Sequence, residues 1–152
     1  MLHERQEGGQ PMKFSDFDRE TWEADGQFYD TCVIPYTGLQ GTETPPETVA
    51  ALERQRDFLD LIEKPFQGRV VTYPAVQYAG AESIALLNAL CQKVKSIGFQ
   101  YVIVSSANEV LLTEEVYESD LLLCQPEMKR NSDTPVSSRI RDEIQRLWLN
   151  GK

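Results

Sequence analysis

The stretch that most constrains the fold covers residues 81–106, where a helical pattern is followed by a glycine and a short apolar run. Apolar side chains recur at three- and four-residue steps from Ile84 to Ile97, which is the spacing of one face of an amphipathic helix. Gly98 comes next, at the position where a left-handed residue commonly ends a helix. Residues 99–104 are mainly aromatic or β-branched, as in a strand that is covered on both faces of a parallel sheet. Together these features predict an α/β domain.

Three further stretches have the composition of strands, and helical patterns lie between them. These strands are expected at Thr31–Pro35, Arg69–Pro74 and Leu121–Cys124. Two helix starts, Thr44-Pro45 and Thr134-Pro135, combine a capping threonine with a proline that suits the first helical position. Strands alternating with helices predict an α/β fold, namely a small three-layer sandwich of about four mostly parallel strands with helices on both faces.

Some boundaries of these elements depend on local residue types. Pro35 is expected to end the first strand, because proline lacks a donor for the ladder. Residues 126–133 are polar and are expected to form a loop. Residues 108–119 leave two alternatives open: one or two helical turns at residues 113–117, or an extension of the sheet by residues 110–112.

The chain of 152 residues has the length of one domain. Hydrophobic residues make up 41% and charged residues 26%, which is ordinary for a globular protein and speaks against wholesale disorder. Residues 1–11 are polar and have no periodicity, so a disordered tail or an upstream extension is expected there. A single α/β domain is expected over residues 12–152.

The charge of the chain is strongly negative and unevenly distributed. The formal net charge is −9, which opposes binding to nucleic acid or to an anionic membrane surface. Residues 1–64 carry 14 acidic and 6 basic side chains, whereas residues 65–152 carry 10 acidic and 9 basic ones. The acidic half is either a set of solvated helix faces or a docking surface for a basic partner.

The residue inventory excludes several common kinds of site. His3 is the only histidine and lies in the predicted tail, so a Ser–His or Cys–His pair and a histidine zinc site are not expected in the domain. The glycine-rich motifs of nucleotide-binding loops are absent, and no cofactor or metal is expected. The three cysteines, Cys32, Cys91 and Cys124, have no close pair, and a reduced, cytoplasmic setting fits them. No apolar run approaches the roughly 18 residues that a membrane span needs.

Polar side chains follow the ends of the predicted strands. In open parallel sheets, ligands bind beyond the carboxyl ends of the strands. This edge therefore predicts a site for a neutral or sugar-like ligand, although strand-end residues also commonly bond loop backbone. Ser106 and Asn108 are expected to be exposed or half-exposed. The candidate ligand-binding residues are Tyr36, Thr37, Tyr78, Ser105, Ser106 and Asn108.

Two other features of this edge have competing interpretations. Residues 38–42 lie between a strand and a helix start, the location of a phosphate cradle, but Glu43 and Glu47 would repel the phosphate. The carboxylates at residues 109–120 are dense enough to bind a divalent cation, but they lack the ligand spacing of a calcium loop. A solvated acidic edge is the simpler interpretation.

Three short segments carry a resemblance to a known family: Met12-Lys13-Phe14-Ser15, Tyr29-Asp30-Thr31-Cys32-Val33-Ile34-Pro35 and Gly68-Arg69-Val70-Val71. With these segments, the chain resembles the YpiF-like family of small uncharacterised proteins of Gram-positive spore formers. The resemblance covers most of residues 12–150 and implies Met12 as the start, so residues 1–11 depart from the family pattern. That family has no established activity, and the resemblance therefore implies no functional residue.

Two functions fit these features. The first is a cytoplasmic, non-catalytic interaction or regulatory module that binds a protein partner or forms a homo-oligomer, without nucleic acid or membrane. The second is a small-molecule-binding domain or an atypical enzyme with its site at the carboxyl ends of the strands. A cavity of a few hundred Å³ at that edge favours the second function. An exposed apolar patch elsewhere favours the first.

Overall fold

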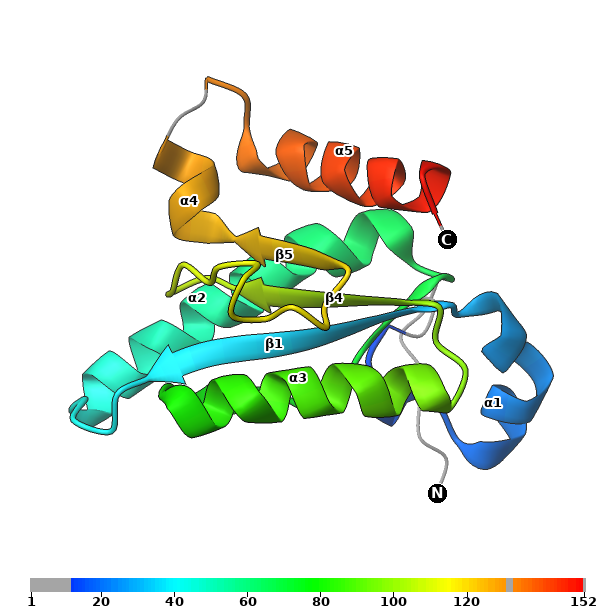
Figure 1. Ribbon diagram of the computed structural model, residues 1–152, viewed down its shortest axis with the longest axis horizontal. Helices are drawn as coiled ribbons and strands as arrows, with labels where there is room; N and C mark the ends of the chain where they lie inside the picture. Colours follow the sequence, from blue (N-terminus) through cyan, green and yellow to red (C-terminus); the bar gives the residue numbers. More distant parts are fainter. Residues whose placement is uncertain (1–11, 131–132, 152) are drawn as a thin grey trace.

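A parallel sheet forms the centre of the molecule (Figure 1). The computed structural model describes residues 12–130 and 133–151, so the tail predicted over residues 1–11 lies outside the described residues. The strands follow the order β2-β1-β4-β5, and β3 pairs with β1 beyond the end of β2. All pairs between these strands are parallel, which confirms the predicted fold class. The strands are β1 (Thr31–Leu39), β2 (Val70–Thr72), β3 (Val76–Tyr78), β4 (Tyr101–Ser106) and β5 (Leu121–Cys124).

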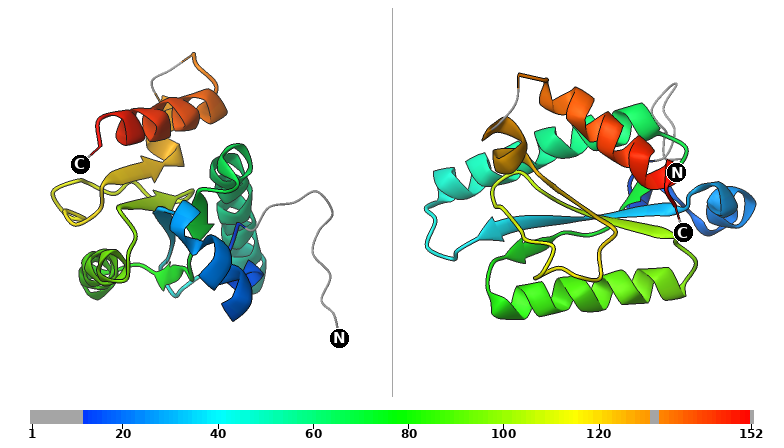
Figure 2. Two further views of the ribbon diagram at one scale, coloured as in Figure 1. Left: turned by 90° about the vertical axis from the view of Figure 1, so that its right-hand side faces the viewer. Right: turned by 45° about the horizontal axis from the view of Figure 1, so that its top comes forward.

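Helices cover both faces of the sheet, as Figures 1 and 2 show. The α-helices are α1 (Arg19–Asp25), α2 (Pro45–Glu63), α3 (Ala81–Ser96), α4 (Gln125–Arg130) and α5 (Val136–Leu149). Short 3₁₀ turns occur at Phe14–Asp16, Gly26–Phe28 and Lys64–Phe66. Helix α3 packs on one face of the sheet, whereas α2 and α5 pack on the other.

The core is split into two layers by the alternation of side chains along the strands. Cys32 and Ile34 point to the α3 layer, whereas Val33 between them points to the layer of α2 and α5. The α3 layer contains the side chains predicted to be buried on the central helix and strand, which are Leu87, Cys91, Val94, Val102 and Val104. Ile97, the last residue of the predicted helical stripe, is 64% exposed, because α3 ends at Ser96 and position 97 leaves the helix.

The prediction that Pro35 ends the first strand is wrong, since β1 continues to Leu39. The backbone of Val33 accepts from Tyr73 and that of Leu39 accepts from Ala79, so both face the β2 and β3 side. The backbone groups of every second residue in a strand face the same neighbour, so the backbone of Pro35 faces this side as well. It lies level with the gap between the end of β2 and the start of β3. The missing amide of Pro35 therefore falls where the neighbouring strand is interrupted.

The segments on either side of β5 decide two further sequence expectations. Residues 125–130 form α4 instead of a loop, because Met128 is buried against the layer of α2 and α5. Within residues 108–119, the predicted strand extension by residues 110–112 does not form. The other alternative is found in its shortest form, as a single turn in which the amides of Glu115 and Val116 donate to the carbonyl of Leu112.

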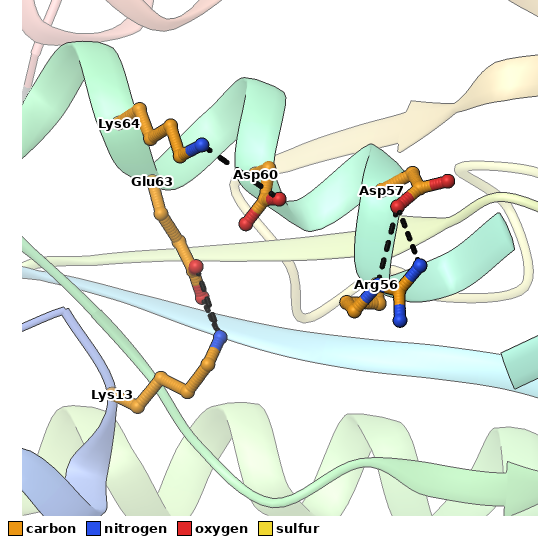
Figure 3. A network of polar contacts seen from close by, with 6 residues as sticks. All are labelled: Lys13, Arg56, Asp57, Asp60, Glu63 and Lys64. Carbon is orange, nitrogen blue, oxygen red and sulfur yellow. Dashed lines mark hydrogen bonds and ion pairs between the residues drawn. The ribbon is translucent and has the colours of Figure 1, made fainter. Parts of the chain in front are cut away.

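The first described residues pack along the free edge of β2. The amide of Thr72 donates to the carbonyl of Met12 at 2.8 Å. The ammonium of Lys13 reaches both carboxylate oxygens of Glu63 at 2.9 and 2.7 Å, as Figure 3 shows. Because the Glu63 side chain is fully buried at the end of α2, this ion pair ties the start of the domain to the helix.

Candidate functional site

A cavity of about 330 Å³ lies at the carboxyl ends of β1 and β4. Strand β1 is followed by a crossover to β2 on one side, and the later crossover through α3 leads to β4 on its other side. The strand order thus reverses here, and ligands of open α/β sheets typically bind at such a switch point. The polar and charged residues that line the cavity are Thr37, Gln40, Glu43, Glu47, Arg54, Asn108 and Glu109.

Asn108 joins the elements around this cavity. Its amide nitrogen donates to the carbonyl of Thr37 at 3.1 Å and to that of Ala51 at 3.2 Å. Its amide oxygen accepts from Nε of Arg54 at 2.7 Å. One side chain after β4 therefore fixes the end of β1 and the side of α2, which is a structural task.

Gly38 gives Glu109 its position over the end of β1. Gly38 has a φ of 79°, in the left-handed region that glycine adopts at low cost. A Cβ atom at this position would collide with Cγ of Glu109. The glycine therefore permits both the turn of the backbone and the close approach of a carboxylate.

The loop between β1 and α2 binds a carboxylate of its own chain. The amides of Gln40 and Gly41 donate to the carboxylate of Glu43 at 2.8 and 2.9 Å. The bond from Gln40 is the main cause that lowers the pKa of Glu43. At the start of α2, Thr44 and Glu47 cap each other through reciprocal bonds of 2.9 and 3.3 Å. The amides that a phosphate would need are thus bonded within the chain.

The structure brings only two of the six candidate ligand-binding residues, Thr37 and Asn108, to this cavity. Tyr36 points into the α3 layer, and its burial is the main cause that raises the pKa of its phenol. Tyr78 lies on the exposed edge of the sheet. The hydroxyl of Ser105 is buried and has no hydrogen-bond partner among the described residues.

Ser106 differs from its expected exposure. It is fully buried, and its hydroxyl accepts from the amide of Glu109 at 3.1 Å. Asn108 is half-buried, within the expected range, but its amide nitrogen already donates twice and its amide oxygen accepts once within the chain. Both residues therefore shape the turn after β4.

Gln55 and Arg54, which the sequence did not single out for this site, contribute to it or support it. Gln55 is buried, donates to the carbonyl of Ser105 at 3.1 Å and accepts from the amide of Ala107 at 2.7 Å. A glutamine within the apolar stripe of α2 was a signal that could have identified it. Arg54 had no comparable signal, because its role depends on the contact between α2 and the end of β4. Glu109 belongs to the acidic segment that the sequence indicated as a possible cation site, and of the carboxylates in that segment only Glu109 lines the cavity.

The charges of the cavity are unbalanced, with three carboxylates and one guanidinium group. In residues 12–130 and 133–151, no group of three or more His, Cys, Asp or Glu is placed to hold a metal ion. Asp120, one carboxylate of the dense acidic segment, accepts instead from the amide of Val102 and pairs with Lys95. A small cationic or neutral polar molecule is the chemistry that this cavity suits best.

The three cysteines lie in the buried α3 layer and do not line the cavity. All three are buried and free. Burial raises the pKa of the Cys32 and Cys124 thiols, and it raises the pKa of Cys91 to about 11. Because the thiolate is the reactive form, these protonated thiols serve as small apolar side chains at neutral pH.

A second and larger hollow lies on the α3 side of the sheet edge. This α3 groove has a volume of about 640 Å³, and its wall is mainly apolar. Tyr78 and Leu86, which line it from β3 and α3, are 58% and 46% exposed. The residues that line the α3 groove are Ile34, Tyr73, Pro74, Ala75, Val76, Gln77, Tyr78, Ser83, Leu86, Leu90 and Val94.

Comparison with other proteins places the chain in a family but assigns it no activity. Among the described residues, no helix combines the length and the apolar character that a bilayer crossing requires. No curated protein and no solved structure matches the chain. A family match covers residues 20–146, most of the chain, and the chain therefore belongs to the family described as "Protein of unknown function (DUF2487)".

Proposed function

We propose that this protein is a non-catalytic interaction module whose docking surface is the α3 groove. The single observation that carries the proposal is the size and character of this groove, at about 640 Å³ with a mainly apolar wall. Large apolar side chains that remain exposed together in a groove are typical of binding sites for other proteins. Tyr78 from β3 and Leu86 from α3 are such side chains.

The polar edge of the sheet supports the same proposal by contrast. Asn108, Ser106 and Glu43 all use their polar groups for bonds within the chain. A ligand that competed for these groups would have to break existing hydrogen bonds, each worth about 0.5–1.5 kcal/mol. The α3 groove offers apolar surface that has no such internal competitor.

Two finer assignments belong to this proposal. Within its family of unknown function, the chain is proposed to belong with the YpiF-like proteins, on the basis of residues 12–15, 29–35 and 68–71. The three buried, free cysteines support a reducing, cytoplasmic location, because such thiols persist there.

The test is capture of the full chain from native cells, followed by mass spectrometry of the bound proteins and small molecules. We compare Leu86→Glu, which places a charge in the α3 groove, with Val49→Glu, which places one on exposed α2 surface. A bound protein, whether another copy or a different chain, is expected to be lost in the first variant and kept in the second. Equal capture by both variants would overturn the groove as the docking surface.

A second candidate function is binding of a small molecule in the cavity at the carboxyl edge. The observation that favours it is the 330 Å³ cavity at the switch point of the sheet. Glu109→Gln removes one charge of its wall without removing a described hydrogen bond of that side chain. This function predicts that a co-purifying cationic molecule is lost in Glu109→Gln and kept in Leu86→Glu.

A further inference from the structure

The outward side of α3 carries apolar and small residues in its middle and opposite charges at its ends. At 100° per residue, positions 82, 85, 86, 89, 93 and 96 share the side that faces away from the sheet. Ala89 is half-buried, and the exposed members are Glu82, Ala85, Leu86, Lys93 and Ser96. We call this outward side the α3 face.

The apolar surface continues on both sides of the α3 face. On one side lies the α3 groove with the exposed ring of Tyr78. On the other side lies the turn at residues 112–118, which Asn88 holds through bonds to the carbonyl of Glu115 and the amide of Glu118. Two further exposed side chains, Leu112 and Tyr117, come from this turn. A broad surface rich in apolar groups is therefore centred on α3.

The charges at the two ends of the α3 face form no ion pair with any described residue. Glu82 and Lys93 are eleven positions apart, so about 16 Å separates them along the helix axis. A parallel copy of the helix would place equal charges side by side. An antiparallel copy places each glutamate beside a lysine, and it also places Leu86 beside Ala89 and Leu90 of the other helix.

We propose that the partner of the α3 face is a second copy of this chain. The two α3 helices pack antiparallel about a two-fold axis level with residues 87 and 88. Such an interface is self-complementary, because Glu82 contacts Lys93 of the second copy and Lys93 contacts its Glu82. Ala85 and Ala89 allow the helices to approach closely at the axis. This inference rests on the proposed interaction function and names its partner.

The experiment measures the mass of the full chain by sedimentation equilibrium over a range of concentrations. The wild-type chain is expected to form dimers. Glu82→Lys and Lys93→Glu each place two like-charged pairs in the interface, so each is expected to dissociate about tenfold more readily or worse. An equal mixture of these two variants restores attraction at both pairs and is expected to form dimers again. Leu86→Glu is expected to be monomeric, and Val49→Glu is the control that keeps the dimer.

Each variant is expected to fold, because all substituted positions are exposed. Circular dichroism and melting at low protein concentration verify this. A wild-type chain that stays monomeric at every concentration overturns the proposal, as does a dimer that neither Leu86→Glu nor Glu82→Lys weakens. If the wild-type chain is monomeric but captures a different protein that Leu86→Glu loses, the self-association proposal is overturned and the proposed interaction function stands. If Leu86→Glu changes neither self-association nor capture, the proposed function fails as well.

Discussion

Helices α2 and α3 lie on opposite faces of the same sheet and bury their inner sides equally well, but their outer sides differ. Phe58 and Ile62 of α2 are fully buried, as are Leu87 and Cys91 of α3. The outer side of α2 carries the ion pairs Arg56–Asp57 and Asp60–Lys64, which Figure 3 shows. The α3 face has alanine and leucine in the corresponding place. The outer side of α2 thus combines ion pairs with the exposed side chain of Val49, whereas the middle of the α3 face carries Leu86 and two alanines without an ion pair.

The first turns of the two helices differ in the same way. Helix α2 begins with the reciprocal caps of Thr44 and Glu47, next to the loop that Glu43 closes. Helix α3 begins after Gly80, which provides no side-chain cap. The start of α2 thus has two reciprocal side-chain caps, whereas the N-cap residue of α3 provides none. Both helices thus contribute to the fold through their buried inner sides, and they differ in the side chains that remain exposed.

The largest expected effect separates the two sides of α3 itself, through the neighbours Leu87 and Leu86. Leu87→Ala empties a fully buried position and is expected to lower the free energy of unfolding by about 2–5 kcal/mol. Leu86→Ala removes a 46% exposed side chain and is expected to change it by less than about 0.5 kcal/mol in the monomer. Denaturant unfolding at low protein concentration measures both. Similar losses in the two variants would mean that the α3 face is part of the core.

A smaller loss of stability is expected when the ion pair between Lys13 and the buried Glu63 of α2 is broken. Lys13→Met leaves the buried carboxylate of Glu63 without its partner, at a cost of about 1–3 kcal/mol. This range is below that of a fully buried pair, because Lys13 is 44% exposed. Lys64→Met is the matched control on the outer side, where the pair with Asp60 is solvated and worth less than about 1 kcal/mol. Equal losses in thermal unfolding would remove the distinction between inner and outer pairs.

The sequence could predict the elements of the fold because their signals are local. The apolar spacing from Ile84 to Val94 and the β-branched run of β4 require no knowledge of distant residues. Pro35 and α4 could not be placed in this way. The effect of Pro35 depends on an interruption between β2 and β3, and α4 depends on the burial of Met128 against other elements.

The candidate site could be located only approximately from the sequence. The rule that ligands bind at the carboxyl ends of strands pointed to Thr37 and Asn108, which do line the cavity. The work that Asn108 does there depends on Arg54 and Thr37, which are 54 and 71 positions away in the chain. Hydrogen bonds over such separations leave no local pattern, so Arg54 could not have been identified.

A smaller effect concerns the carboxylate that closes the loop before α2. The pKa of Glu43 is lowered from its ordinary value of 4.5 by the amides of the loop, so its carboxylate stabilises the folded chain above that pH. The stabilisation is lost as the pH falls through the lowered pKa. Glu43→Gln is therefore expected to melt slightly lower than wild type near neutral pH, with a difference that shrinks below pH 4.5. Melting scans across this range measure it, and a difference that is independent of pH would contradict the role of the charge.

The smallest effect on the melting temperature is expected from removal of residues 1–11. The experiment tests whether the contacts on the α2 side of the sheet begin at Met12. A chain that begins at Met12 keeps the nitrogen of Met12 near the carboxylate of Asp16 and its carbonyl bonded to Thr72. Residues 1–11 include only Met1 and Leu2 as large apolar side chains, so their removal is expected to leave the melting temperature unchanged. A chain that begins at Ser15 is the control, and it should melt lower because it lacks the Lys13–Glu63 pair. A drop of several degrees already at Met12 would show that residues 1–11 pack on the domain, and it would make His3 a candidate functional group.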